Sequence, residues 1–279
     1  MTVDAHHHVW DLSVRDQDWI TGPELRPLRR NFTLAELAPQ ARAAGVDRTV
    51  LVQTVTVPEE TPEFLALADA HDLVGAVVGW TDLTRPEVAD ELARLRELPG
   101  GRYLKGIRHQ VQGEPDPQWL LRSDVRRGLA AVADAGLVYD LVVLPHQLPA
   151  CAEAAASLPG LTFVLDHLGK PPIAAGEPEP WATAVRTLAA LPNTVAKLSG
   201  LVTEADHASW AAGDLRPYTD VALEAFGPHR LMFGSDWPVC TLAATYGEVV
   251  SVTGELTPQL SEPERAALLS GTATRVYRL

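Results

Sequence analysis

Cysteine is scarce in this chain of 279 residues, which contains only Cys151 and Cys240. The two lie far apart and neither belongs to a CxxC pair, so the sequence predicts neither a disulfide framework nor a thiolate zinc site. No histidine and asparagine pair is arranged to activate Cys240, and we interpret it as a packing residue. This cysteine usage is typical of a reducing compartment, and we expect a cytoplasmic protein.

Long apolar runs and an excess of positive charge are also missing. The longest apolar stretches, such as VLVQTV and LVVL, fall far below the roughly 20 residues of a membrane span, and the amino terminus lacks signal-peptide features. Lysine and arginine number 23 against 36 aspartates and glutamates, a net charge of −13, which repels phosphate backbones and anionic lipids. We expect a small-molecule partner, no nucleic acid and no membrane. The oligomeric state stays open, a homo-oligomer included.

Short runs rich in β-branched residues recur along the chain and alternate with segments of helical spacing. The sequence predicts eight strands, over residues 3–9, 49–55, 74–80, 104–110, 138–144, 161–168, 194–199 and 231–237. Helices are expected over 34–44, 62–70, 86–98, 124–135, 148–157, 181–190 and 218–226. Regular alternation implies a parallel sheet, and eight strands in a chain of this length favour a closed α/β barrel. No GxGxxG follows the first strand, which disfavours a dinucleotide fold.

No domain boundary is visible, and we expect a single domain over residues 1–279. The segments rich in proline and glycine, 113–117 and 170–180, follow predicted strands and are interpreted as loops at the barrel mouth rather than linkers. Residues 11–30, which include Trp19 and two prolines, form a further long loop after the first strand. This loop is a candidate lid or wall of the active site.

Histidines and aspartates stand where several predicted strands end. Asp4, His6 and His8 occupy alternate positions of the first strand and are expected on one face. Two imidazoles so placed suit a divalent metal such as zinc. A purification tag is the alternative for this histidine run, but a tag would be longer and would lie outside an apolar strand. Later strands end in His146, in Asp166 and His167, and in Asp236.

Each of these polar residues has an ordinary explanation by itself, because polar side chains often cap strands. Taken together they are harder to dismiss. The carboxyl ends of strands one, five, six and eight all face the same mouth in a parallel barrel, and the catalytic groups of this fold lie there. The sequence therefore predicts an active site built from these strand ends.

The ordered set DAHHHVW, PHQ, LDHLGKP and FGSDWP resembles the amidohydrolase superfamily. Within it, the chain is most similar to the amidohydrolase-related family that includes sugar lactonases such as L-fuconolactonase and L-rhamnonolactonase. The phrases LKGIRHQVQ and KLSGLVTEA are similar to the same subgroup. The resemblance implies a distorted (β/α)8 barrel, or TIM barrel, that hydrolyses a sugar-derived lactone in carbohydrate catabolism.

The resemblance also implies a cofactor and its ligands. One divalent ion, zinc before others, is expected, and the matching ligands are His6, His8, His146 and Asp236. His167 matches a histidine that polarises or orients the substrate. Strand four ends in Arg108 and His109, with no carboxylated lysine, which argues against a second metal. Some relatives resemble metal-free lactonases, so catalysis without a metal is the second expectation.

The expected mechanism is attack of water on a lactone carbonyl. Asp236 would take the proton of the water and return it to the ring oxygen, while His167 would hold the oxyanion. A sugar offers both apolar faces and hydroxyl groups, and the expected substrate contacts are Trp10, Gln53, Trp80, Arg108, His109 and Trp237. Ordinary packing is the alternative for each tryptophan. Lys197 is either a buried charge paired with a carboxylate or a substrate contact.

Two other functions compete with sugar-lactone hydrolysis. The first is hydrolysis of a dicarboxylate or pyrone-type lactone, or nonoxidative decarboxylation, by an enzyme of the same superfamily. A dicarboxylate would require several arginines at the mouth, where Arg108 is the clearest candidate and Arg102 and Arg122 depend on how the loops fold. The second is a catalytically dead barrel that binds a ligand. Loss of Asp236 or of the paired histidines would favour it, and all of them are present.

Overall fold

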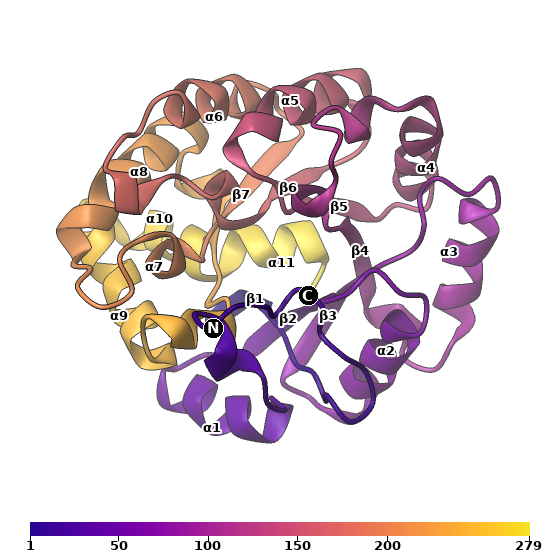
Figure 1. Cartoon of the computed structure of the whole chain (residues 1–279), viewed down its shortest axis with the longest axis horizontal. Helices are drawn as coiled ribbons and strands as arrows, with labels where there is room; N and C mark the ends of the chain where they lie inside the picture. The colour runs from indigo at the N-terminus through magenta and orange to yellow at the C-terminus, as the bar shows by residue number, and fades with distance from the viewer.

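The computed structural model describes residues 1–279, and its strands form one parallel sheet paired in sequence order. The strands are β1 (Val3–His7), β2 (Arg48–Val52), β3 (Val74–Gly79), β4 (Leu104–His109), β5 (Val138–Leu141), β6 (Phe163–Leu165), β7 (Thr194–Leu198) and β8 (Leu231–Phe233). The sheet closes where the His8 N–H donates to the Trp237 carbonyl oxygen at 2.7 Å. The fold is therefore a (β/α)8 barrel, with helices in a ring around the strands (Figure 1).

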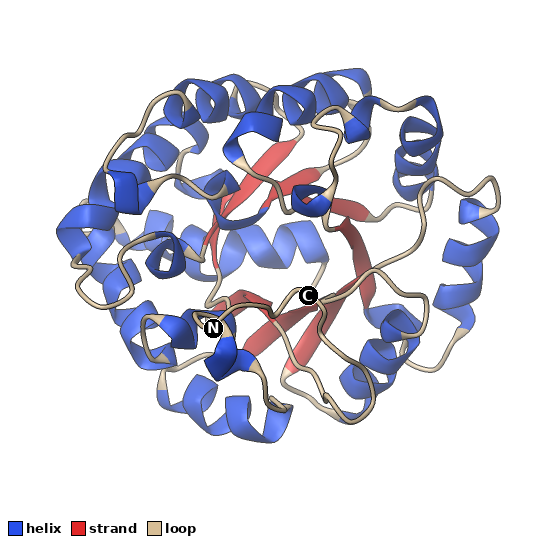
Figure 2. Cartoon of the chain, viewed as in Figure 1, coloured by secondary structure: helices blue, strands red, loops and turns tan.

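Helices connect the strands and complete the outer layer (Figure 2). They are α1 (Leu34–Ala43), α2 (Glu60–Ala70), α3 (Val88–Glu97), α4 (Ser123–Asp134), α5 (Leu148–Ser157), α6 (Trp181–Ala189), α7 (Leu201–Glu204), α8 (Ala212–Phe226), α9 (Tyr246–Leu256), α10 (Glu262–Ala266) and α11 (Thr272–Tyr277). The first and fourth turn back through Gly45 and Gly136, at φ 73° and 64°, a left-handed conformation that glycine adopts at little cost.

The predicted fold class is confirmed, and all eight predicted strands are present. The sixth and eighth are three residues long, because the chain turns into loops where their polar ends begin. The sequence does not predict α7, α9, α10 or α11, and α8 begins at Ala212 rather than Tyr218. Pro217 lies inside α8, and an internal proline disguises the start of a helix because it usually breaks one.

The apolar core has two parts. A cluster of 63 buried residues fills the space between the sheet and the surrounding helices. A second cluster of 13 lies inside the barrel, where small valines and alanines of the strands meet Ala273, Val276 and Tyr277 of α11. In Figure 1 this last helix crosses the middle of the ring. Apolar packing thus fills part of the barrel, and polar side chains occupy the carboxyl ends of the strands.

The structure also shows the state of the two cysteines and the apolar character of the helices. Cys151 and Cys240 are both free and buried, and burial raises the pKa of the Cys151 thiol to about 12. None of the helices combines the length and the apolar character that a membrane crossing requires.

Candidate active site

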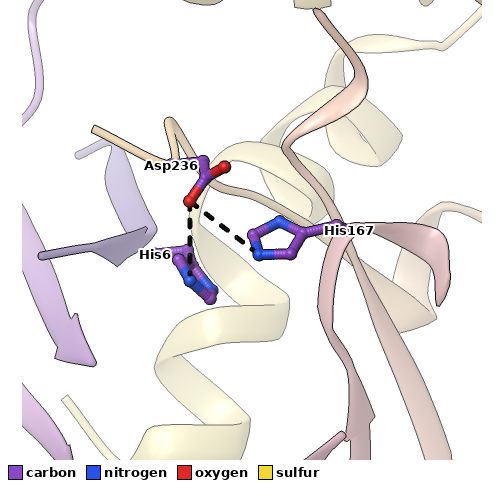
Figure 3. Close-up of side chains that lie close together, drawn as sticks. All are labelled: His6, His167 and Asp236. Atoms are coloured by element: carbon purple, nitrogen blue, oxygen red, sulfur yellow. Dashed lines mark ion pairs between the residues drawn. The ribbon is translucent and has the colours of Figure 1, made fainter. Parts of the chain in front are cut away.

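Three of the sequence-predicted site residues meet at the carboxyl ends of the strands. His6 comes from β1, His167 from the turn after β6, and Asp236 from the loop after β8 (Figure 3). The Asp236 Oδ1 lies 3.8 Å from the Nε2 of His6 and 3.8 Å from the Nε2 of His167. One ligand atom from each of the three residues lies within 4.8 Å of the others. The site can therefore present two imidazole nitrogens and a carboxylate to one point.

His8 belongs beside this group, whereas His146 does not. The His8 Nε2 lies 3.1 Å from the Nε2 of His6 and 3.6 Å from the Oδ1 of Asp236. Its Nδ1 lies 2.8 Å from the carbonyl oxygen of Val52, so the Nδ1–H donates there and the Nε2 keeps its lone pair. His146 is exposed in a single 3-10 turn, Pro145–Gln147, before α5. The structure does not bring His146 to the predicted metal ligands, because β5 has already ended at Leu141.

The first strand does not keep simple alternation. The register between β1 and β2 shifts between Asp4 and His7, the mark of a β-bulge. The Asp4 carboxylate accepts a hydrogen bond from the hydroxyl of Tyr246 on α9 at 3.0 Å, whereas His6 and His8 meet inside the barrel. The prediction that Asp4 shares their face is therefore wrong, because the bulge reverses the direction of the side chains that follow it.

The displaced aspartate instead holds the loop that carries Asp236. The backbone N–H and the hydroxyl of Ser235 donate to the Asp4 carboxylate at 2.8 and 2.6 Å. The backbone N–H of Asp236 donates to the carbonyl oxygen of His6 at 2.8 Å. Burial raises the pKa of Asp4 to about 6 against these hydrogen bonds. The position of Asp236 is thus fixed by contacts that do not involve its own side chain.

Left-handed backbone is concentrated at the site. His167, Leu168, Lys170 and Asp236 all have φ between 51° and 58°, a region that residues other than glycine seldom adopt and that costs roughly 1–2 kcal/mol per residue. Such conformations persist where the surrounding structure enforces them, commonly at active sites. Here they turn the side chains of His167 and Asp236 toward the same point.

Gly200 makes room for His167. It has φ 67°, and a Cβ added there would lie 2.6 Å from the Nδ1 of His167, which itself lies 2.9 Å from the hydroxyl of Ser199. We expect Gly200→Ala to lower kcat at least tenfold, because the methyl group would displace the imidazole of His167. A left-handed alanine would also strain the backbone.

A matched change isolates this effect. Gly213 lies in α8 with no atom within 4 Å of an added Cβ, so Gly213→Ala should leave kcat unchanged and keep or raise the stability. Steady-state kinetics and urea unfolding of both variants test the assignment. Equal kcat for the two variants would show that Gly200 does not shape the site.

Burial and neighbours set the protonation states. Burial lowers the pKa of His167 to about 4 and that of His6 and His8 below the ordinary value. Burial works against ionisation of Asp236, but its interactions with His167, His8 and Lys170 outweigh it and keep its pKa below the ordinary value. At neutral pH the site therefore holds neutral imidazoles beside a carboxylate. That donor set fits one divalent metal ion such as zinc.

A buried network of charges lies beneath the site. The Lys197 Nζ lies 2.6 Å from an oxygen of Asp140 and 2.9 Å from one of Asp166, and all three side chains are fully buried. The Arg108 guanidinium reaches the other oxygen of Asp166 at 2.9 Å. Burial opposes ionisation of Asp166, but Lys197, then His6 and then Arg108 hold its pKa well below the ordinary value. Lys197 is thus a buried barrel charge paired with carboxylates, the first of its two alternatives.

A cavity of about 330 Å³ opens above these groups. Four of the predicted site residues line it, namely His8, Arg108, His167 and Asp236. Trp19 and Leu25 also line it, which places the predicted loop 11–30 at its wall. Lys170 and Glu204 line the cavity as well. Both of these lie in phrases that carry the family resemblance, LDHLGKP and KLSGLVTEA, which is the signal by which the sequence could have found them.

The other predicted substrate contacts do not line this cavity. Trp10 and Trp237 are buried and pack edge-on against Phe32, so ordinary packing explains both. Trp80 donates to the Nδ1 of His109 at 3.0 Å, outside the cavity wall. Gln53 is fully buried.

Gln53 acts on the site through another residue. Its Oε1 accepts from the Nε–H of Arg108 at 2.8 Å, and its backbone carbonyl accepts from the same guanidinium. Gln53 therefore orients a cation that does line the cavity. His109 is held in turn by Glu114, with 2.7 Å between the Nε2 and the Oε1.

Comparison with known proteins identifies the family. The amidohydrolase family model matches residues 3–279. An L-fucono-1,5-lactonase of Burkholderia multivorans is 41% identical, over 100% of this chain and 96% of that protein. One from Burkholderia ambifaria is 36% identical, over 99% and 95%. The crystal structure of a B. multivorans amidohydrolase with bound zinc has a TM-score of 0.92 at 41% identity, over 100% of this chain and 99% of that chain. The chain belongs to the amidohydrolase family and is an enzyme of the hydrolase class.

Proposed function

We propose that this enzyme opens a sugar-derived lactone, an internal carboxylic ester, by attack of water. The observation that carries the proposal is a buried, ionised Asp236 that faces neutral imidazoles at the floor of a polar cavity. The names of the two relatives, both L-fucono-1,5-lactonases, support the choice of substrate class. A cavity of about 330 Å³ is within the usual range for a small-molecule site.

Asp236 is the proposed base. Its carboxylate accepts a proton from the water whose oxygen attacks the lactone carbonyl carbon, and the bond between that carbon and the ring oxygen breaks in turn. The proton then passes to the ring oxygen, which leaves as a hydroxyl group of the product acid. A carboxylate with a low pKa is ionised before each turnover, as the base must be.

His167 and Arg108 are the proposed oxyanion donors. When the Ser199 hydroxyl donates to the Nδ1 of His167, at 2.9 Å, the neutral ring carries its proton on the Nε2, which faces Asp236. That N–H can donate to the carbonyl oxygen as negative charge develops. The Arg108 guanidinium lines the same cavity and adds a fixed positive charge, held in place by Gln53 and Asp166.

A divalent ion also fits this site. His6, His167 and Asp236, with His8 beside them, would hold it. Such an ion supplies Lewis acidity toward the carbonyl oxygen, or acidifies a water. The tautomer of His167 then matters, because only an Nδ1–H that donates to Ser199 leaves the Nε2 lone pair free for a ligand bond.

The number of bound ions is a direct test of the ligand assignment. We expect the purified enzyme to carry at most about one divalent ion per chain, because one compact set of ligands is present. The double variant His6→Ala, His8→Ala should lose it. Elemental analysis measures both, with His146→Ala as the matched control that keeps the ion. Two ions per chain, or loss of the ion from the His146 variant, would contradict the assignment.

The acidic-lactone and decarboxylase alternatives would require more arginines at the mouth. Arg108 alone of the three candidates lines the cavity. Arg102 pairs with Asp69 and Arg122 with Asp124, at 2.8 and 2.6 Å, both on the surface. The loops therefore do not bring either arginine to the site.

A panel of lactones tests the proposed function. Opening a lactone releases an acid, so a pH indicator reports turnover directly. Neutral aldonolactones should be opened faster than aldaric acid monolactones, aromatic carboxylates or phosphoesters. The panel is run with zinc-loaded and with chelated enzyme, which separates the need for a metal from the choice of substrate. Absence of turnover on every aldonolactone in both states would refute the proposal.

A further inference from the structure

Lys170 and Glu204 form an open pair of charges on the cavity wall. Lys170 follows the turn that carries His167, and Glu204 is the last residue of α7. The Lys170 Nζ lies 3.7 Å from the Glu204 Oε1, and the two side chains are 25% and 26% exposed. Both line the same cavity as Asp236. The pair can therefore contact a lactone ring that is bound in this cavity.

Neither charged group is committed to a close partner. In a hydrogen bond the donor and acceptor heavy atoms lie about 2.7–3.2 Å apart. The separation of 3.7 Å therefore leaves the pair without a direct hydrogen bond. No hydrogen bond to a third residue engages the ammonium or the carboxylate. Arg108, in contrast, has its guanidinium bound to Gln53 and Asp166. Three ammonium donors and the carboxylate lone pairs of the open pair remain available to a ligand.

The charges that line the cavity balance. Arg108 and Lys170 supply two positive charges, and Glu204 and Asp236 supply two negative ones, with His207 at the exposed rim. Burial raises the pKa of Glu204, and the charge of Asp236 adds to this, while Lys170 opposes it. Lys170 thus favours the ionised form of the Glu204 carboxyl group. An additional carboxylate from a substrate would find no unmatched positive charge among the side chains that line the cavity.

We propose that Lys170 and Glu204 recognise adjacent hydroxyl groups of the substrate and exclude lactones that carry a carboxylate, an inference that rests on the proposed function. A hydroxyl group both donates and accepts, so one hydroxyl can donate to Glu204 while its neighbour accepts from Lys170. A carboxylate only accepts, and beside Glu204 it meets a like charge. Glu204 is thus the residue that determines specificity for a neutral ring.

The test compares two substrates on one variant. Kinetics are measured with a neutral aldonolactone and with an aldaric acid monolactone, which keeps one free carboxylate. In Glu204→Gln we expect kcat/KM to fall about tenfold or more for the neutral lactone, through KM more than kcat, as a hydrogen bond to a charged group is weakened. For the acidic lactone kcat/KM should rise, because Lys170 is released and the repelling charge is gone. The ratio of kcat/KM for the neutral lactone to that for the acidic lactone then falls by more than tenfold.

Two further variants complete the test. One removes the positive charge of the pair, and the other removes an unrelated carboxylate as a control. Lys170→Gln should lower kcat/KM for the neutral lactone but should not raise it for the acidic one, since Glu204 then remains as an unopposed negative charge. Glu224→Gln removes an exposed carboxylate of α8 that pairs with Arg186 and should leave the ratio unchanged. Because both substrates are measured on the same preparation, a partly unfolded variant does not alter the ratio.

The outcomes separate this inference from the proposed function. Wild-type enzyme that opens neither lactone refutes the proposed function and, with it, this inference. Wild-type enzyme that opens the neutral lactone, with a ratio that shifts less than about threefold in Glu204→Gln, overturns the inference alone. A rise in acidic-lactone turnover in Lys170→Gln would overturn it as well, because the selectivity would then not depend on the charge of Glu204.

Discussion

Asp236→Asn is expected to lower kcat on an aldonolactone by about 10²- to 10⁴-fold, the usual contribution of a general base. The amide has the same shape but cannot accept the proton of the attacking water. Asparagine tolerates the left-handed backbone that Asp236 adopts at φ 58°. The backbone contact from this residue to the carbonyl oxygen of His6 does not involve the side chain. The loop should therefore fold unchanged, and the loss should appear in kcat.

Asp220→Asn, on the exposed face of α8, is the control and should keep wild-type kcat. Zinc content is measured beside the kinetics, because Asp236 also belongs to the group that can hold a metal. A fall in kcat with retained metal assigns the proton transfer to Asp236. A kcat within about threefold of wild type would remove this residue from the role of base.

The fold could be predicted from the sequence because each strand is a short β-branched run that a helix separates from the next. The alternation of strands and helices ends at β8, because no strand follows it. The sequence therefore does not predict α9, α10 and α11. It also cannot detect a bulge. One extra residue in β1 turned Asp4 away from His6, and no side-chain periodicity in the sequence reveals such a shift.

The candidate site was predictable where residues lie within three positions of a strand end and not where they lie farther along a loop. His6, His8, His167 and Asp236 meet as the barrel topology requires. Trp237 directly follows Asp236, and the sequence analysis therefore expects it to contact the substrate. In the structure it packs on Phe32 instead. Glu204 reaches the cavity through a short helix that the spacing of strands does not predict. Loop geometry, rather than residue type, decides which of these side chains face the substrate.

Lys197→Met is expected to lower the free energy of unfolding by about 3–5 kcal/mol, the cost of leaving buried charges without their partner. The lysine side chain is fully buried and lies 2.6 and 2.9 Å from Asp140 and Asp166. Without it, Asp166 keeps the Arg108 guanidinium at 2.9 Å and the His6 ring at 3.4 Å. Asp140 keeps only the Tyr277 hydroxyl, at 2.8 Å. Methionine fills much of the same volume, so the loss reports charge rather than packing.

The dependence on pH distinguishes this effect from a cavity. Burial raises the pKa of Asp140 to about 6 even with Lys197 in place, and removal of the lysine must raise it further. A carboxyl group whose pKa is higher in the folded state binds more protons there than in the unfolded chain. Stability is therefore lost as the pH rises from about 4 through the folded-state pKa. The deficit of the variant should be larger at about pH 8 than at about pH 5.5.

Urea unfolding at both pH values measures the deficit, and a double-mutant cycle assigns it. Lys105→Met changes a partly exposed lysine of β4 that has no carboxylate partner and should alter stability by less than about 1 kcal/mol. Adding Asp140→Asn to Lys197→Met should restore part of the lost stability, because the carboxylate left without a cationic partner is then removed. A deficit that is independent of pH and is not relieved by Asp140→Asn would mean that Lys197 contributes packing, and that the charges beneath the site do not stabilise one another.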